Sequence, residues 1–306
     1  MNLTGQRILL AGGAGFIGSH LVARLLADGN KVRIADDCSN GRREWVPKDA
    51  EFIEADLTTE DGVAKAVTSD LDLVFHLAAH KSVNDEDPKS QFAANTTMTH
   101  TILERMREVG VTNIAFTSSS TVYGEAPRPT PEDYAPLEPI SVYGTGKIAD
   151  EGLVSTYAHS HDFTAWTFRF ANIVGPRLIG AVIPDFIEKL REEPETLTIL
   201  GNGLQEKSYM HIEDCLDAMI HVIENTDSSL NTYNLGTRTT TSVNRIADIV
   251  SDELGLNPEY EYTGGERGWT GDVPKMRLSI EKLSALGWEP EIESNAAVRQ
   301  ATAELL

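Results

Sequence analysis

Residues 7–29 read RILLAGGAGFIGSHLVARLLADG, and this stretch decides the fold. RILLA is a short apolar run typical of a buried strand, and SHLVARLLADG is amphipathic in the manner of a helix. Between them stand Gly12, Gly15 and Gly18, with one residue more at the front than the spacing G-x-G-x-x-G. A strand, a glycine turn and a helix form the context of a dinucleotide-binding loop. Gly12 allows the tight turn, Gly15 lets the backbone approach a pyrophosphate, and Gly18 permits close helix–strand packing.

The next strand, KVRIADD at 31–37, ends in two carboxylates, Asp36 and Asp37. A carboxylate at this distance from the glycine turn accepts hydrogen bonds from the ribose hydroxyls of adenosine and repels a 2′-phosphate. The basic pair Arg42 and Arg43 follows closely and could argue for a 2′-phosphate, but we interpret it as solvated loop surface. The sequence therefore predicts NAD rather than NADP as the cofactor.

Further strands and helices alternate along the first half of the chain. The predicted elements are a strand at 72–79, a helix at 89–109, a strand at 113–120, a helix at 142–160 and a strand at 163–172. Alternation with short connections predicts an α/β fold with a doubly wound parallel sheet. Ligands of such sheets bind at the carboxyl ends of the strands. Asp56, after the third strand, is a candidate for binding the adenine amine, and Lys81 could reach the cofactor or a substrate phosphate or simply be solvated.

Three polar residues at the middle of the chain form the predicted catalytic set. Ser119 belongs to TSSSTVYG at 117–124, and Tyr143 and Lys147 belong to SVYGTGK at 141–147. On a helix, a spacing of four places both side chains on one face. An ammonium beside a phenol favours the phenolate and draws its pKa down from about 10. The Tyr-x-x-x-Lys spacing is common by chance, and the serine run and the glycine loop before it give it weight.

The charge balance is strongly acidic. The chain has 306 residues, with 47 Asp and Glu against 26 Lys and Arg, and a formal net charge of −21. The acidic residues are scattered, which indicates a solvated surface suited to high salt more than a docking site for a basic partner. Nucleic acid and anionic membranes would be repelled, so neither is an expected partner.

Other classes of protein are disfavoured by what the sequence contains. No apolar run approaches the roughly 20 residues that span a bilayer, and the N-terminus has no signal-peptide pattern. Cys38 and Cys215 are expected in a loop and a helix, without a disulfide, as in a cytoplasmic protein. His76, His80 and His211 lack metal-ligand spacing, and we predict no metal site.

Taken together, these motifs resemble the extended short-chain dehydrogenase/reductase family, and within it the UDP-galactose 4-epimerases. The resemblance runs along nearly the whole chain through GGAGFIGSHL, HLAAHKSV, TSSSTVYG, SVYGTGK, RFANIVGPR, LGNGLQEKSY and GWTGDVPKM. RFANIVGPR, KSYMHIEDCLDAM and RGWTGDVPKM look most like archaeal members, and the acidic composition suggests a haloarchaeal one.

The resemblance implies a Rossmann domain over 1–175, to which 212–236 returns, and an interleaved α+β nucleotide-sugar-binding lobe over 176–211 and 237–306. It implies NAD held through the whole cycle, Tyr143 as base, Lys147 on the nicotinamide ribose and Ser119 on the sugar O4. A homodimer is expected through a four-helix bundle built from 89–109 and 142–160. Its expected apolar positions are Ile102, Met106, Leu153, Val154 and Tyr157.

The same resemblance implies the remaining binding residues. The expected cofactor residues are Gly12, Gly15, Phe16, Ile17, Gly18, Asp36, Asp37, Asp56, Leu57, Leu77, Ala78, Ala79, Lys81, Asn95, Tyr143 and Lys147. The expected substrate residues are Ser119, Thr121, Tyr143, Asn172, Lys207, Arg267, Asp272 and Met276. Lys207 stands where Arg is common, which weakens bidentate phosphate recognition. Met276 lies near the C2 substituent, where a bulky Tyr excludes N-acetylhexosamines, and the adaptable Met should close the pocket less firmly.

We expect inversion of C4 in the pair UDP-glucose/UDP-galactose, with measurable turnover of UDP-N-acetylglucosamine. Related dehydratases and UDP-xylose synthases use a Glu two residues before the Tyr of the VYG segment. Here Ser120 and Thr121 follow Ser119, so loss of water lacks its acid. The alternatives are epimerases of UDP-N-acetylglucosamine or UDP-glucuronate, a dehydratase or reductase, and a non-catalytic NAD-sensing or scaffold protein.

Overall fold

A computed structural model describes residues 1–80 and 87–306, and the chain divides into two compact units. Unit 1 consists of Met1–Ser119, Val142–Arg169 and Met219–Tyr233, and unit 2 of Ser120–Ser141, Phe170–Ala218 and Asn234–Leu306. The two units differ from the expected domains in several stretches, the longest of which is 120–141, which falls in unit 2. Thr130 explains this, because it donates its N–H to the carbonyl of Arg277 and accepts the N–H of Ser279.

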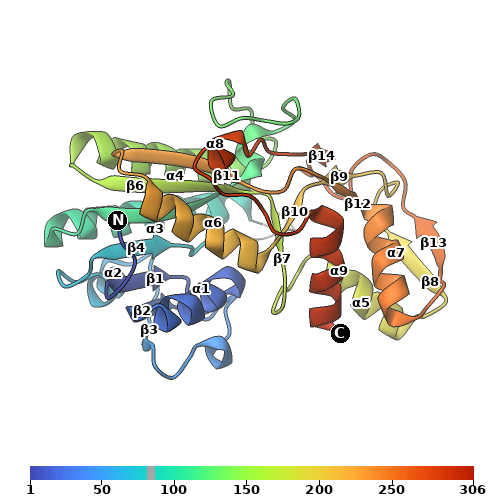
Figure 1. Cartoon of the computed structure of the whole chain (residues 1–306), viewed down its shortest axis with the longest axis horizontal. Coiled ribbons are helices and arrows are strands. Elements are labelled where there is room, and N and C mark those ends of the chain that lie inside the picture. Colours follow the sequence, from blue (N-terminus) through green and yellow to red (C-terminus); the bar gives the residue numbers. More distant parts are fainter. Residues whose placement is uncertain (81–86) are drawn as a thin grey trace. The chain divides into compact units, whose positions relative to one another are not determined.

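The centre of unit 1 is a parallel sheet with the strand order β11-β6-β5-β4-β1-β2-β3 (Figure 1). The strands are β1 Arg7–Ala11, β2 Lys31–Asp36, β3 Glu51–Glu54, β4 Leu73–His76, β5 Asn113–Ser119, β6 Thr164–Phe170 and β11 Leu230–Leu235. All pairings from β3 through β2, β1 and β4 to β5 are parallel, and Leu10 lies opposite Ile34 on one side and Phe75 on the other. This order confirms the predicted doubly wound sheet.

Helices cover both faces of this sheet, since β1 is buried on both sides. Leu9 and Ala11 belong to one apolar cluster with α2 Glu60–Ala66, α3 Pro88–Val109 and α4 Val142–Ser160. Ile8 and Leu10 alternate with them and are equally buried, on the other face, the side of α1 Phe16–Ala27. The helix α6 Ile212–Asn225 has residues in both units.

The helices α3 and α4 pack against each other and have the predicted bounds to within a residue. The side chain of Asp87 accepts the N–H of Ser90 at the start of α3, Pro88 occupies the first turn, and Gly110 with φ 77° ends the helix. The five apolar positions expected for the dimer could also have faced the sheet instead. Four of them, Ile102, Met106, Val154 and Tyr157, are buried in the core of unit 1. The homodimer itself stays a prediction.

Unit 2 is an α+β unit built from short strands and helices. Its strands pair as β7 Asn172–Val174 with β10 Tyr209–His211, β8 Thr196–Ile199 with β13 Glu259–Tyr262, and β9 Glu206–Lys207 with both β12 Thr241–Ser242 and β14 Lys275–Met276. Its helices are α5 Val182–Glu192, α7 Val243–Leu254, α8 Glu281–Ser284 and α9 Ser294–Leu305. The core lies among α5, α7 and α9.

Two single 3-10 turns, η1 Arg43–Trp45 and η2 Ser120–Tyr123, complete the described structure. Cys38 lies in the loop after β2 and Cys215 in α6, and both are free thiols. In the described part of the chain, no helix is long and apolar enough to cross a membrane. Nor do three or more His, Cys, Asp or Glu side chains come together there as a metal site would require.

Candidate functional site

The glycine loop between β1 and α1 is shaped by steric limits at two of its three glycines. Gly12 has a φ of +84°, and a Cβ there would lie 2.5 Å from the backbone N of Ala78. A Cβ on Gly18 would lie 2.4 Å from the carbonyl oxygen of Gly12. A Cβ on Gly15 would have its nearest neighbour 3.4 Å away, so packing inside the loop does not require glycine there. The missing side chain instead leaves room outside the loop. The helix α1 begins directly after Gly15 without a side-chain cap, which suits its first N–H groups to a phosphate.

Asp36 ties this loop to the next one. The carboxylate is buried at the end of β2, and it accepts the N–H of Ala14 at 2.9 Å and the N–H of Cys38 at 2.8 Å. Burial raises the pKa of Asp36, and the two backbone donors oppose that rise. Each oxygen still has a lone pair for a ribose hydroxyl. The sequence argument missed this bracing role, because it depends on which backbone amides the fold brings near.

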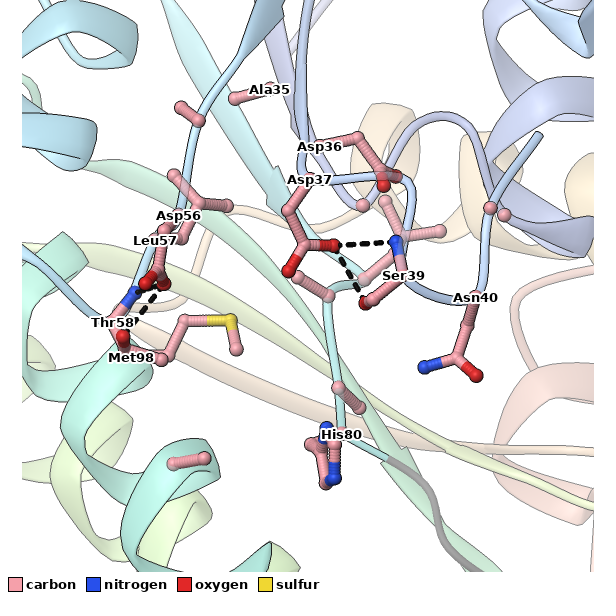
Figure 2. Close-up of a pocket in the computed structure, with 18 residues that line it drawn as sticks. Ala35, Asp36, Asp37, Ser39, Asn40, Asp56, Leu57, Thr58, His80 and Met98 are labelled. Atoms are coloured by element: carbon pink, nitrogen blue, oxygen red, sulfur yellow. Dashed lines mark hydrogen bonds between the residues drawn. The ribbon is translucent and has the colours of Figure 1, made fainter. Parts of the chain in front are cut away.

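A cavity in unit 1 opens at the carboxyl ends of β1 to β4 (Figure 2). Nine predicted cofactor residues line it, namely Gly12, Gly15, Asp36, Asp37, Asp56, Leu57, Leu77, Ala78 and Ala79. Nine more line it that we did not predict: Ala35, Ser39, Asn40, Gly41, Ala55, Thr58, His80, Ala94 and Met98. Most of these stand beside the predicted ones after a strand end, so extending each predicted loop by a few residues would have found them.

Phe16, Ile17, Gly18, Asn95, Tyr143 and Lys147, also predicted to bind the cofactor, are not among the residues that line this cavity. Phe16, Ile17 and Gly18 form the first turn of α1. The side chain of Asn95 accepts the N–H of His80 at 2.7 Å and donates to its carbonyl at 3.1 Å, so it holds the loop after β4. Lys81 lies outside the described residues.

The chemistry of the cavity fits NAD. Leu57 and Met98 offer an apolar surface, and Asp37 and Asp56 add exposed carboxylates (Figure 2). Asp37 accepts two hydrogen bonds from Ser39 and Asp56 accepts two from Thr58, so both are held in place.

The basic pair near the cavity has contacts of its own. The guanidinium of Arg43 lies over the ring of Phe52 at 4.2 Å, and that of Arg42 lies over Trp45 at 5.3 Å. Neither lines the cavity. Carboxylates without a facing arginine suit the free ribose hydroxyls of NAD better than the 2′-phosphate of NADP.

Tyr143 and Lys147 lie on one face of α4, and Ser119 is the last residue of β5. Lys147 is 3% exposed, donates from Nζ to the carbonyl of Thr117 at 2.8 Å and lies 5.9 Å from the centre of the Tyr143 ring. Burial lowers the pKa of Lys147 to about 8. The ammonium of Lys147 therefore lies where its charged form is disfavoured by loss of solvent.

The pKa of Tyr143 differs from our expectation. We expected the ammonium to draw it downward, yet burial, with a smaller push from the carboxylate of Asp150, raises it to about 12. Desolvation outweighs the attraction of Lys147 here. Burial thus favours the neutral phenol over the phenolate.

Beneath this face of α4 lies a buried ion pair. The guanidinium of Arg169 donates to Glu151 at 2.7 and 3.0 Å, and the hydroxyl of Ser118 donates to the same carboxylate at 2.5 Å. Arg169 and Glu151 are both largely shielded from solvent. This bidentate pair fixes α4 against β5 and β6.

In unit 2, four of the predicted substrate residues form one group: Asp272, Lys207, Arg267 and Met276. Its carboxylate, 2% exposed, pairs with the ammonium of Lys207 and accepts the N–H of Gly268 at 3.0 Å, while its carbonyl accepts from Arg267. Met276 is buried and lies opposite Lys207 in the β14–β9 ladder. The sequence argument missed Glu125, which pairs with Arg267, and Trp269, whose ring lies 5.0 Å from Nζ of Lys207.

Asn172 and Thr121 are the two other predicted substrate residues of unit 2, and Asn172 is linked to the group because its N–H bonds to Ser208, whose own N–H bonds to Met276. Asn172 begins β7 and hydrogen-bonds through its side chain to Tyr209. Thr121 belongs to the turn η2 and is half-buried.

The sequence matches the model of the NAD dependent epimerase/dehydratase family over residues 8–236. The chain belongs to this family. The family is NAD dependent, so NAD is the cofactor of this chain.

Individual relatives are similar over nearly the full length. A UDP-glucose 4-epimerase of Mycolicibacterium smegmatis is 33% identical over 301 residues, 94% of each chain. A crystal structure of a UDP-galactose 4-epimerase is 40% identical with a TM-score of 0.89, covering 97% of this chain and 98% of that one. The Thermus thermophilus UDP-glucose 4-epimerase in complex with NAD is 32% identical with a TM-score of 0.88, at the same coverage.

Epimerases of other sugars are also similar. A UDP-N-acetylglucosamine 4-epimerase from Methanobrevibacter ruminantium is 27% identical with a TM-score of 0.87, and 98% of each chain is covered. The family and its chemistry are therefore shared among several sugar substrates.

Proposed function

We propose that the protein inverts C4 of a UDP-hexose, with UDP-glucose and UDP-galactose as the main pair. The observation that supports this is that half-buried Tyr143 and buried Lys147 share one face of α4, in the same unit as the cavity that fits NAD and as Ser119 at the end of β5. When bound, NAD supplies a reversible hydride acceptor for C4. The 4-keto sugar can then turn over and accept hydrogen on its opposite face.

The residues of unit 1 would move the proton in this reaction. Tyr143 would take the proton of the 4-hydroxyl, and Ser119 would donate a hydrogen bond to O4. The ammonium of Lys147, 5.9 Å from the Tyr143 ring, would stabilise the phenolate. Burial disfavours the phenolate. Removing the ammonium of Lys147 should therefore slow the reaction more than removing a cation beside an exposed tyrosine would.

The residues of unit 2 would bind the nucleotide part. Lys207 pairs with the carboxylate of Asp272, and Arg267 pairs with Glu125 and donates to the backbone carbonyl of Asp272. These two cations would turn from their present partners to the pyrophosphate when the nucleotide binds. Ser120 and Thr121 cannot supply a carboxyl proton for loss of water, which disfavours a dehydratase. A product with the same mass as the substrate, formed without net use of NAD, would distinguish an epimerase from a dehydratase or a reductase. Any turnover at all would distinguish it from an NAD-sensing protein.

The experiment is to change Tyr143 to Phe and measure the interconversion of UDP-galactose and UDP-glucose. Removing a general base costs about 10²–10⁴ in rate. We expect kcat to fall by at least this much while bound NAD stays at the wild-type amount. Tyr157→Phe is the matched control, because Tyr157 is a buried tyrosine of the same helix that donates to Glu104. Near-wild-type activity of Tyr143→Phe with NAD bound would contradict the assignment.

A further inference from the structure

Asp150 is a buried carboxylate that the proposed reaction does not use. It is 1% exposed and stands three residues after Lys147 on α4, so both face the same side of the helix. Burial raises its pKa to about 6, against the pull of Lys147 and a hydrogen bond from Thr99. Above that pH the carboxylate is charged in a place where charge is costly.

The neighbours of Asp150 on α3 and β4 are neutral. The hydroxyl of Thr99 donates to Asp150, and Nε2 of His76 lies 3.0 Å from that hydroxyl oxygen. A hydroxyl has one proton, so the oxygen of Thr99 must accept from His76, which fixes the tautomer with hydrogen on Nε2. Burial lowers the pKa of His76 to about 3, and the ring is neutral at working pH.

The other charged groups near Asp150 are already matched. Glu151 on α4 is paired with Arg169 of β6 through two hydrogen bonds. Oδ1 of Asp150 has no hydrogen-bond partner among the described residues. The titratable and charged groups that face Asp150 are thus Tyr143, Lys147 and Glu151 on α4, His76 on β4 and Arg169 on β6. Of these, only Lys147 is a cation whose charge no carboxylate bond in the described structure balances.

We propose that Asp150 is a positioning residue, the counter-charge that keeps Lys147 in its ammonium form beside Tyr143. This inference rests on the proposed function. Asp150 also pushes the phenol toward its neutral form, but it is seven residues from Tyr143 and three from Lys147. Residues three apart on a helix are neighbours on one face, whereas residues seven apart are separated by two turns, so Asp150 is placed to act first on Lys147. Removing the charge of Asp150 should therefore release the proton of Lys147 at a lower pH.

The direct test measures the pKa of Lys147 by NMR. The chain has ten lysines, so protein labelled with ¹³C at lysine Cε gives a simple spectrum, in which Lys147→Arg identifies the resonance. In Asp150→Asn we expect the pKa of Lys147 to fall by about one pH unit or more relative to wild type. Asp49→Asn, which removes an exposed carboxylate of unit 1, should leave it unchanged. An unchanged pKa of Lys147 in folded Asp150→Asn protein would overturn the proposal.

A second variant guards against a folding defect. Thr99→Val removes the hydroxyl that favours the charged form of Asp150, so it should lower the pKa of Lys147 in the same direction, and Thr99→Ser should restore it. Wild type, Asp150→Asn, Thr99→Val and Thr99→Ser are then assayed for kcat/KM against pH. The decline at alkaline pH should move to lower pH in Asp150→Asn, with KM nearly constant. A shifted pKa of Lys147 with an unchanged pH profile would also overturn the role.

The two measurements keep the two proposals apart. The NMR titration needs no sugar, so a wild-type protein that fails to epimerise would count against the proposed function and leave the result for Lys147 standing. Conversely, if the wild-type enzyme is active but the pKa of Lys147 is the same in Asp150→Asn, only the proposal about Asp150 is contradicted.

Discussion

At the residue scale, two acidic residues that were expected to bind ligands are also bound to the protein's own backbone. Asp36 accepts the amides of Ala14 and Cys38, and Asp272 accepts the amide of Gly268 while it pairs with Lys207. In both places a carboxylate at a loop fixes the groups that would contact the nucleotide. Replacing either should therefore weaken binding through loss of order as well as loss of a contact.

Met276 gives a prediction about sugar size. It is 7% exposed in β14, with Lys207 opposite, so a larger ring there must intrude on its surroundings. We expect wild type to convert UDP-N-acetylglucosamine measurably, and Met276→Tyr to lower kcat/KM for it by about tenfold or more relative to UDP-galactose. Lys275→Tyr, at the neighbouring exposed position, is the control. Outright rejection of the N-acetyl substrate by wild type, or an unaltered ratio in Met276→Tyr, would show that Met276 is not the gate.

At the element scale, α1 and its loop depend on close backbone contact. A Cβ on Gly18 would lie 2.4 Å from the carbonyl of Gly12, whereas Gly152 on α4 has open space around it. Gly18→Ala should destabilise the protein by about 1–3 kcal/mol and lower the NAD that co-purifies. Gly152→Ala should raise stability by up to about 1 kcal/mol and keep NAD. Thermal melting and acid release of the nucleotide measure both, and wild-type NAD content in Gly18→Ala would refute the packing argument.

The comparison of sequence with structure is also clearest for elements. The bounds of α4 were predicted correctly, because its alternation with buried strands is a strong local signal. The assignment of 120–141 to unit 2 was not predictable, since it follows from hydrogen bonds between Thr130 and residues near 278. The pKa of Tyr143 was missed for a similar reason. A spacing of four shows that Lys147 is near, but it does not show how far the phenol is removed from water.

At the scale of the whole molecule, the net charge of −21 is the dominant feature. The repulsion among the excess negative charges is offset only slightly by exposed ion pairs such as Arg24 with Asp28 and Arg107 with Glu104. Each pair of this kind contributes at most about 1 kcal/mol to stability. Screening the excess negative charge should therefore stabilise the protein. We expect Tm to rise from low to molar KCl and to change less with an uncharged osmolyte. A flat or falling Tm would reject adaptation to salt without bearing on the enzymology.

The central claim concerns the whole molecule as a catalyst that inverts C4 and regenerates its own cofactor. The most direct measurement is ¹H NMR of UDP-galactose incubated in D₂O with the purified protein and no added NAD. The account predicts the appearance of UDP-glucose with the original hydrogen still on C4, because the hydrogen removed from C4 returns without exchange with solvent. No inversion at C4, or inversion accompanied by deuterium at C4, would contradict it.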